Sequence, residues 1–177
     1  MLVFGGSQGA RAINTAMGEA LQNSGILRQD FHIIHQTGFD DHARMQTLYE
    51  EVGVDAQVVP FLYDMPHVLK AADLVIARSG AGTLAELAVC GKPAILIPFP
   101  HATHGHQEKN ARAAEAEGAA IVILQSELTG GRLVQEIEWF LNHPDHLKTM
   151  AERSFSRRIT NATARMVEEC QNLLANR

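Results

Sequence analysis

Short apolar runs of strand length alternate with helical patterns along the chain from Leu2 to Leu124. The runs predicted to be strands are Leu2–Phe4, Phe31–His35, Ala56–Val59, Leu74–Ala77, Ala94–Ile97 and Ala119–Leu124. The stretches predicted to be helices between them are Gln8–Gln22, Asp40–Val52, Met65–Ala71, Leu84–Val89 and Gln107–Ala116. Because parallel neighbours need a helical crossover, this alternation predicts an α/β fold with a Rossmann-like, doubly wound parallel sheet of about six strands.

From Gly130 onward the pattern is helical only, with breaks near Pro144 and at Thr160-Asn161. No internal repeat, low-complexity tract or linker interrupts the sequence. We therefore predict a single Rossmann-like domain over residues 1–160 and a C-terminal helix over residues 161–177. Met1 stands directly at the start of a predicted strand, which leads us to expect a cut made inside a longer protein.

Composition narrows the function classes. A net charge of −5 and a pI near 6.0 argue against a dedicated nucleic-acid or anionic-membrane surface. Cys90 and Cys170 both fall in helical patterns and make no disulfide framework, which favours a reducing compartment. No apolar run approaches the roughly 20 residues of a membrane-spanning helix, so any membrane contact is expected to be peripheral.

The segment Arg78–Glu86 follows a predicted strand and leads into a predicted helix. The unpaired N–H groups of a helix's first turn attract anions, and the small residues Gly80–Gly82 let a phosphate approach the backbone. Thr83 adds a hydroxyl, and Glu86 lies one turn further along, where its carboxylate can reach a neighbouring diol. The pattern fits a pyrophosphate-linked ribose. The alternative is an ordinary strand-to-helix turn with a solvated glutamate.

Each unusual loop comes directly after a predicted strand, and these loops are Gly5–Ala10, Pro60–Met65, Arg78–Thr83 and Pro98–Gln107. In parallel sheets the carboxyl ends of the strands share one edge, and ligands bind outside that edge. Chance would scatter such loops to both ends of the sheet. The convergence therefore predicts a ligand site at the carboxyl edge.

The turn Gly5-Gly-Ser-Gln-Gly9 lacks the G-x-G-x-x-G spacing of a dinucleotide site. The acid found about 20 residues further on, Asp30, comes before the second strand rather than at its end, which argues against a Rossmann dehydrogenase. The turn still offers backbone donors, the Ser7 hydroxyl and the Gln8 amide to a phosphate or sugar. The alternative is a tight turn that needs glycine only for its geometry.

Three histidines of one loop, His101, His104 and His106, superficially resemble a metal cluster. Zinc needs three or four ligands in compact geometry, and this loop contains two prolines, a glycine and no obvious acidic partner. We predict no metal site here. Polar contacts to a sugar and simple solvation both stay open as roles for these rings.

Three separated motifs, in register, resemble the MurG family of bacterial glycosyltransferases. They are Gly5–Arg11, Arg78–Thr83 with Glu86, and Pro98–His101 with His106-Gln107 and Asn110-Ala111. The resemblance covers essentially all 177 residues, but only the C-terminal half of the family's proteins. It implies one half of a GT-B fold that binds UDP-N-acetylglucosamine without a metal or other cofactor, and whose last helix packs back toward the N-terminal domain.

The resemblance also implies which residues of this chain contact the donor. The implied set is Ser7, Gln8, Phe61, Leu62, Met65, Ala81, Gly82, Thr83, Leu84, Ala85, Glu86, Gln107 and Asn110. Glu86 would accept hydrogen bonds from the ribose, and Ser7 and Thr83 would hold the pyrophosphate together with the Gly82 backbone.

The same resemblance implies that Leu62, with Phe61 and Met65 nearby, lines the uracil pocket. Ala81 and Gln107 would contact the N-acetylglucosamine. One departure concerns the position before Gln107, where some relatives carry glutamine and this chain carries histidine, so that histidine is not assigned.

The implied reaction transfers N-acetylglucosamine to undecaprenyl-linked lipid I, giving lipid II for peptidoglycan. The acceptor's C4 hydroxyl would attack the anomeric carbon with inversion, while the helix N-terminus at Ala81–Thr83 and the Ser7 turn stabilise the departing UDP. No general base stands out, because the family's acceptor loop and membrane-facing surface belong to the N-terminal half. This polypeptide is therefore expected to bind donor without turning over alone, and the intact enzyme to lie peripherally on the cytoplasmic face of the inner membrane.

Two alternatives stay open. The chain could be a standalone donor-binding subunit of a two-chain UDP-N-acetylglucosamine transferase, which recruits a membrane partner. It could also be a UDP-sugar epimerase or a bare nucleotide-binding module. The run Gly5–Arg11 favours the bacterial transferase, and an epimerase would need catalytic acids where the loop around His101 offers histidines.

Overall fold

The computed structural model describes residues 1–25, 27 and 31–175 and contains a six-stranded sheet. All neighbouring strands are parallel, in the order β3-β2-β1-β4-β5-β6. The strands are β1 (Leu2–Phe4), β2 (Ile33–Gln36), β3 (Ala56–Val59), β4 (Val75–Ala77), β5 (Ala94–Leu96) and β6 (Ala120–Val122). This is the Rossmann strand order, so the predicted α/β doubly wound fold is confirmed.

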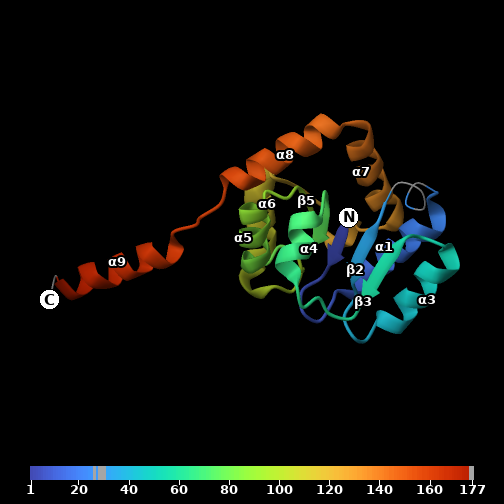
Figure 1. Cartoon of the computed structure of the whole chain (residues 1–177), viewed down its shortest axis with the longest axis horizontal. Coiled ribbons are helices and arrows are strands. Elements are labelled where there is room, and N and C mark those ends of the chain that lie inside the picture. The colour runs from blue at the N-terminus through green and yellow to red at the C-terminus, as the bar shows by residue number, and fades with distance from the viewer. Residues whose placement is uncertain (26, 28–30, 176–177) are drawn as a thin grey trace.

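Helices fill the connections and the C-terminal part of the chain (Figure 1). They are α1 (Arg11–Asn23), α3 (His42–Val52), α4 (Met65–Ala71), α5 (Ala81–Cys90), α6 (His106–Ala116), α7 (Gly130–Asn142), α8 (Pro144–Ser156) and α9 (Ala162–Ala175). Short 3-10 turns, η1 (Thr103–Gly105) and η2 (Gln125–Glu127), lie in the loops after β5 and β6.

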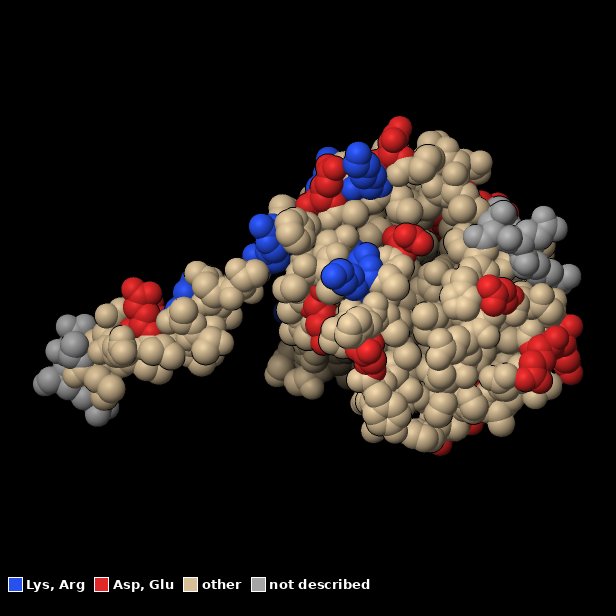
Figure 2. All heavy atoms as spheres, viewed as in Figure 1, with Lys and Arg blue, Asp and Glu red and all other residues tan. Residues whose placement is uncertain are grey.

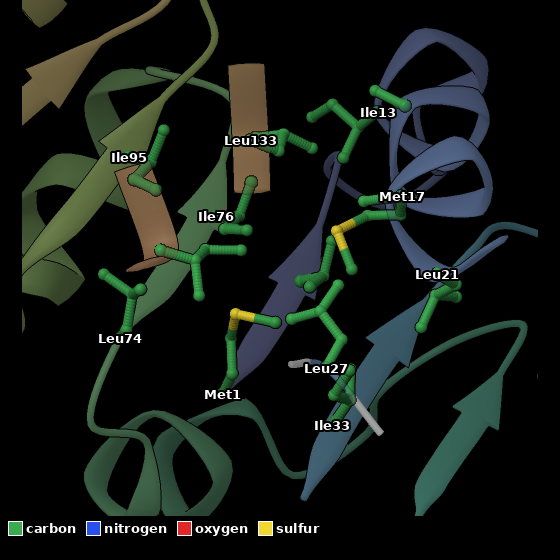
Figure 3. Packing of buried hydrophobic residues seen from close by; sticks show 14 of the residues in the cluster. Met1, Ile13, Met17, Leu21, Leu27, Ile33, Leu74, Ile76, Ile95 and Leu133 are labelled. Carbon is green, nitrogen blue, oxygen red and sulfur yellow. The ribbon is translucent and has the colours of Figure 1, made fainter. Parts of the chain in front are cut away.

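The sheet is covered on both faces, because successive strand residues point to opposite sides. Val3 and Ile76 pack with α1, α3 and α7 in the cluster of Figure 3. Leu2 and Val75 pack with α4, α5 and α6 on the other face. Each fully buried aliphatic side chain contributes about 1.5–3 kcal/mol. Covering both faces explains why the strands read as continuous apolar runs rather than alternating ones.

Some predicted element ends were wrong. The second strand was predicted from Phe31 and begins at Ile33. The first helix was predicted from Gln8 and begins at Arg11, since Gly9 has a φ of 76°, which a right-handed helix does not accommodate. Asp30, considered above as a dinucleotide ligand, lies outside the described residues.

The C-terminal helices differ in how they pack. At the start of α7 the Gly130 N–H donates to the Glu19 carboxylate of α1 at 2.8 Å, and a side chain at Gly130 would clash with α1. By contrast, α9 extends away from the rest of the chain (Figure 1), and residues 161–174 are exposed. Its apolar side chains Met166, Val167 and Leu173 are among the exposed ones. Residues 176–177 of the predicted last helix lie outside the described part.

On the face drawn in Figure 2, acidic and basic side chains lie side by side over α8, whereas the right-hand part of the view shows acidic side chains and no basic ones. Over the described residues, no helix has both the length and the apolar character needed to cross a membrane. Cys90 is half-buried and Cys170 is exposed, and both are free thiols.

Candidate functional site

A cleft of about 540 Å³ opens at the carboxyl edge of the sheet, beside β1 and β4. The strand order reverses between these two strands, and such a switch point is where open α/β sheets bind ligands. The cleft is lined by Gly5, Gly6, Ser7, Gln8, Gly9, Ala10, Arg11, Ala12, Arg78, Phe99, Gln107 and Gln125. This lining contains two arginines and no acidic residue, which suits an anionic ligand.

The loop after β1 is held close to the loop after β2. Gly6 and Gly9 have φ values of 97° and 76°, and the Gly9 N–H donates to the Gly6 carbonyl at 2.9 Å. A side chain on Gly9 would clash with the Thr37 carbonyl, and one on Gly38 would clash with the Gln8 carbonyl. Glycine is therefore required by the close approach of two backbones, while the side chains of Ser7 and Gln8 remain exposed.

Arg78 contributes a charged side chain to the cleft lining, and it was not among the site residues predicted from the sequence. Its guanidinium donates to the carbonyls of Ile97 at 3.1 Å and Pro98 at 3.0 Å, and to Gln125 Oε1 at 2.6 Å. It also lies over the Phe99 ring, 5.4 Å from the ring centroid. Burial lowers the pKa of Arg78, yet a guanidinium keeps its charge in proteins, so the cleft retains a fixed cation.

The helix start beside this cleft was predicted three residues too late. Helix α5 begins at Ala81 rather than Leu84, because a first turn needs no intrahelical N–H bonds and so tolerates Gly82 and Thr83. The Leu84 N–H is bonded to the Gly80 carbonyl, and no side chain caps the helix. Ala81 and Gly82 are exposed and Thr83 is half-buried, so their N–H groups and the helix dipole face outward.

Glu86 and Ala85 lie on the exposed side of α5, and Leu84 is half-buried. Among the residues that the structure describes, the Glu86 carboxylate makes no hydrogen bond or ion pair. A free carboxylate one turn from a helix N-terminus is positioned to accept from a ligand's hydroxyl groups. The structure does not place Glu86 in the lining of the 540 Å³ cleft itself.

Gln107 and Asn110 belong to the start of α6, which is fastened to the end of β4 through Ser79. The buried Ser79 hydroxyl donates to the Gln107 carbonyl at 2.7 Å, and the Asn110 amide donates to the Ser79 carbonyl at 3.3 Å. The Gln107 side-chain oxygen accepts from the Phe99 N–H at 3.0 Å, and Gln107 is part of the cleft lining. Its amide N–H groups have no hydrogen-bond partner among the residues that the structure describes.

The apolar candidates form a separate wall. Leu62 and Met65 pack with Leu84 of α5 in one hydrophobic cluster, through the contact between α4 and α5. Phe61 is half-buried, and its ring meets the Tyr63 ring edge-on, with 5.0 Å between centroids. The carboxyl edge therefore presents an apolar wall at α4 and α5 and a polar, cationic cleft beside β1 and β4.

The three loop histidines are exposed and do not converge. His106 Nδ1 is 2.7 Å from the Thr103 carbonyl, and the His101 ring meets the Phe99 ring edge-on at 5.6 Å. His104 has a φ of 52°, a left-handed conformation. Within the described part of the chain, no group of three or more His, Cys, Asp or Glu side chains is arranged to hold a metal ion.

Of the residues proposed from the sequence, the structure brings Ser7, Gln8 and Gln107 together in one cleft, which Arg78 and Gln125 also line. The remaining predicted residues lie outside that cleft, in the loop after β3 and in α4, α5 and α6. Position directly after a strand was the available signal for Arg78, whereas Gln125 meets it across 47 residues of sequence and gave no signal.

The fold and this site define a class of protein. The family that matches is described as the glycosyltransferase family 28 C-terminal domain, and it matches residues 1–166, so the chain belongs to this family. Among solved structures, the crystal structure of Acinetobacter baumannii MurG superposes with a TM-score of 0.86 at 34% identity, over 97% of this chain and 49% of that one. The predicted resemblance to MurG is confirmed.

The curated relatives carry the corresponding enzyme name, UDP-N-acetylglucosamine--N-acetylmuramyl-(pentapeptide) pyrophosphoryl-undecaprenol N-acetylglucosamine transferase. The Myxococcus xanthus protein is 45% identical over 174 residues, 98% of this chain and 45% of the relative. The Syntrophus aciditrophicus protein is 44% identical, over 98% of this chain and 48% of the relative. The chain therefore spans about half the length of the curated relatives it matches. A UDP-GlcNAc 2-epimerase from Neisseria meningitidis, at 15% identity and a TM-score of 0.64, shares the fold alone.

Proposed function

We propose that this chain is the donor-binding half of an inverting glycosyltransferase that transfers N-acetylglucosamine from UDP-N-acetylglucosamine to lipid I, giving lipid II in peptidoglycan synthesis. The observation that carries the proposal is the acid-free cleft beside β1 and β4, which combines two arginines with a glycine loop. Membership of glycosyltransferase family 28 supports it independently.

In this proposal the diphosphate lies between the Gly5–Ala10 loop and the N-terminus of α5. Backbone N–H groups at Gly82 and Thr83, the Ser7 hydroxyl and the Arg78 charge would stabilise the negative charge that develops on the β-phosphate as UDP leaves. Glu86 would accept from both ribose hydroxyls. The uracil would lie against the wall of Phe61, Leu62 and Met65, where an aromatic ring can stack on a base.

The sugar would lie toward α6, where the Phe99 N–H holds the Gln107 side-chain amide and Ser79 bonds to the Gln107 carbonyl and to Asn110. The acceptor hydroxyl would approach from the N-terminal half of the intact enzyme, which would also carry the general base and the peripheral membrane contact at the cytoplasmic face. We further propose that residues 1–160 form the donor domain and that α9 lays its exposed apolar side chains on that N-terminal half.

The first expected result is that the chain binds UDP and UDP-N-acetylglucosamine weakly and with similar affinity. Most of the proposed contacts go to the nucleotide and phosphates rather than to the sugar. Isothermal titration calorimetry measures both ligands, with GDP as the control for base recognition by the apolar wall. No heat with UDP at millimolar concentration contradicts the proposed donor site.

A second expected result is that EDTA leaves the UDP affinity unchanged. The proposed diphosphate ligands are backbone N–H groups, the Ser7 hydroxyl and the Arg78 guanidinium, and the sequence has no Asp-x-Asp pair to carry Mg²⁺ beside them. The measurement is a UDP titration before and after chelation, repeated with added Mg²⁺. A tenfold loss of affinity on chelation would show that the protein uses a metal after all.

A further inference from the structure

A network of buried, hydrogen-bonded polar side chains lies beneath the loop after β1. His35, Asn14 and Tyr49 have exposed fractions of 0%, 1% and 2%. His35 Nδ1 lies 3.0 Å from the Tyr49 hydroxyl, and His35 Nε2 lies 3.1 Å from Asn14 Oδ1. These residues come from β2, α1 and α3, so the network connects three elements on one face of the sheet.

The donor and the acceptor of each hydrogen bond in this network can be assigned. The Asn14 Nδ2 group donates to the Thr37 carbonyl at 2.8 Å and to Asp41 Oδ2 at 2.9 Å, so Oδ1 of the same amide is the acceptor. His35 Nε2 must therefore carry the proton, and Nδ1 accepts from the Tyr49 hydroxyl. Every polar atom is used, which makes the arrangement of Asn14 unique.

Asp41 is the last member of this hydrogen-bonded network, and its carboxylate is used in an unusual way. It occupies the position before α3, where an aspartate commonly caps the helix, yet it makes no capping hydrogen bond. Its oxygens instead accept from Asn14 and from Arg44, whose Nε and guanidinium NH2 each lie 3.1 Å away. The carboxylate is thus committed to holding Asn14 and the Thr37 loop in place.

The segment that Asn14 holds, residues 36–38, packs against the loop after β1. Thr37 and Gly38 pack backbone to backbone against Gln8 and Gly9, with no room for a side chain on either glycine. The Gln36 side-chain amide donates to the Gly6 carbonyl at 2.6 Å from the same segment. The position of the Gly5–Ala10 loop therefore depends on the position of residues 36–38.

We propose that Asp41, Asn14 and His35 are positioning residues that fix the Gly5–Ala10 loop for the diphosphate of the donor, without touching the donor themselves. This inference rests on the proposed function, since it assigns the diphosphate to that loop. Its consequence is that loosening the network weakens diphosphate binding selectively, because the uridine end is held by α4 and α5 on the other face of the sheet.

The test compares UDP, titrated by calorimetry, with uridine, titrated by ligand-observed NMR. Asp41→Ala removes the acceptor for Asn14 and is expected to lower UDP affinity about 3- to 10-fold while leaving uridine affinity unchanged. Asp41→Asn keeps an acceptor oxygen and is expected to restore most of the UDP affinity. Arg44→Met leaves the carboxylate in place and is expected to have a smaller effect of the same kind.

Glu50→Ala is the matched control, because Glu50 is exposed on the same helix and, within the described part of the chain, its side chain bonds to Gln46 alone. Equal UDP affinity in Asp41→Ala and the unchanged protein overturns this inference and leaves the proposed function standing. Parallel losses for UDP and uridine also overturn it, since they mean a general structural role. Absence of UDP binding by the unchanged protein overturns the proposed function and this inference with it.

Discussion

Lowering the pH from 7 to 5 is expected to reduce the free energy of unfolding by about 2 kcal/mol through His35 alone. Burial lowers the pKa of His35 from 6.5 to about 3, with nearby Asp41 opposing and Arg44 adding to the shift. Below pH 6.5 the His35 imidazole therefore binds a proton in the unfolded chain but stays neutral in the folded chain. The stabilisation is complete above that pH and is lost progressively as the pH falls toward about 3.

The size of this effect at pH 5 depends little on the folded-state value. Because that value lies well below pH 5, the loss is governed by the ordinary histidine pKa of 6.5 in the unfolded chain. Asp41 adds its own loss only at lower pH, because its hydrogen bond with Arg44 lowers its pKa below the ordinary 3.8. The interval between pH 7 and pH 5 therefore isolates the histidine from that carboxylate.

Urea unfolding at pH 7 and pH 5 measures the change in the free energy of unfolding between the two pH values. In His35→Asn this change is expected to be smaller by about 2 kcal/mol. Met45→Ala is the matched control: Met45 is fully buried on α3 and has no titratable group, so the variant should be less stable at both pH values with the difference retained. If His35→Asn keeps the full pH dependence, the buried imidazole is not its source.

The fold was predictable because its determinants are local in the sequence. Runs such as Leu2–Phe4 and Ala94–Leu96 are apolar at every position, and helix-length segments separate them, so a parallel sheet covered on both faces follows directly. Element ends were less predictable. The first turn of α5 contains Gly82 and Thr83, which are poor helix formers, and only their place at a helix start makes them acceptable.

The candidate site was predictable as a set of loops, though not as a set of contacts. Loops after strands must converge at one edge, which placed Ser7, Gln8 and Gln107 in one cleft. The partnership of Arg78 with Gln125 depends on where β6 ends relative to β4, and no local pattern encodes that distance. His35 gave no sign of its burial either, because its partners Asn14 and Tyr49 come from two other elements, α1 and α3.

Glu86→Ala is expected to weaken UDP binding by about 1.5–3 kcal/mol, the usual scale for a hydrogen bond to a charged group. This corresponds to roughly ten- to a hundredfold in the dissociation constant measured by calorimetry. The fold is expected to survive, because the Glu86 side chain is exposed on α5 and bonds to no residue that the structure describes. Glu152→Ala, at an exposed site on α8, serves as the control for loss of one negative charge.

The decisive comparison uses a second ligand, 2′,3′-dideoxy-UDP, which lacks both ribose hydroxyls. If Glu86 accepts from the ribose, removing its carboxylate costs affinity for UDP, whereas the dideoxy ligand has nothing for the carboxylate to hold. Removing a negative charge near the diphosphate is expected to strengthen binding of the dideoxy ligand slightly. The two ligands are thus expected to respond in different directions to one substitution. Equal losses would mean that Glu86 acts through the structure of α5, and the ribose would then have to be held by another residue of this edge.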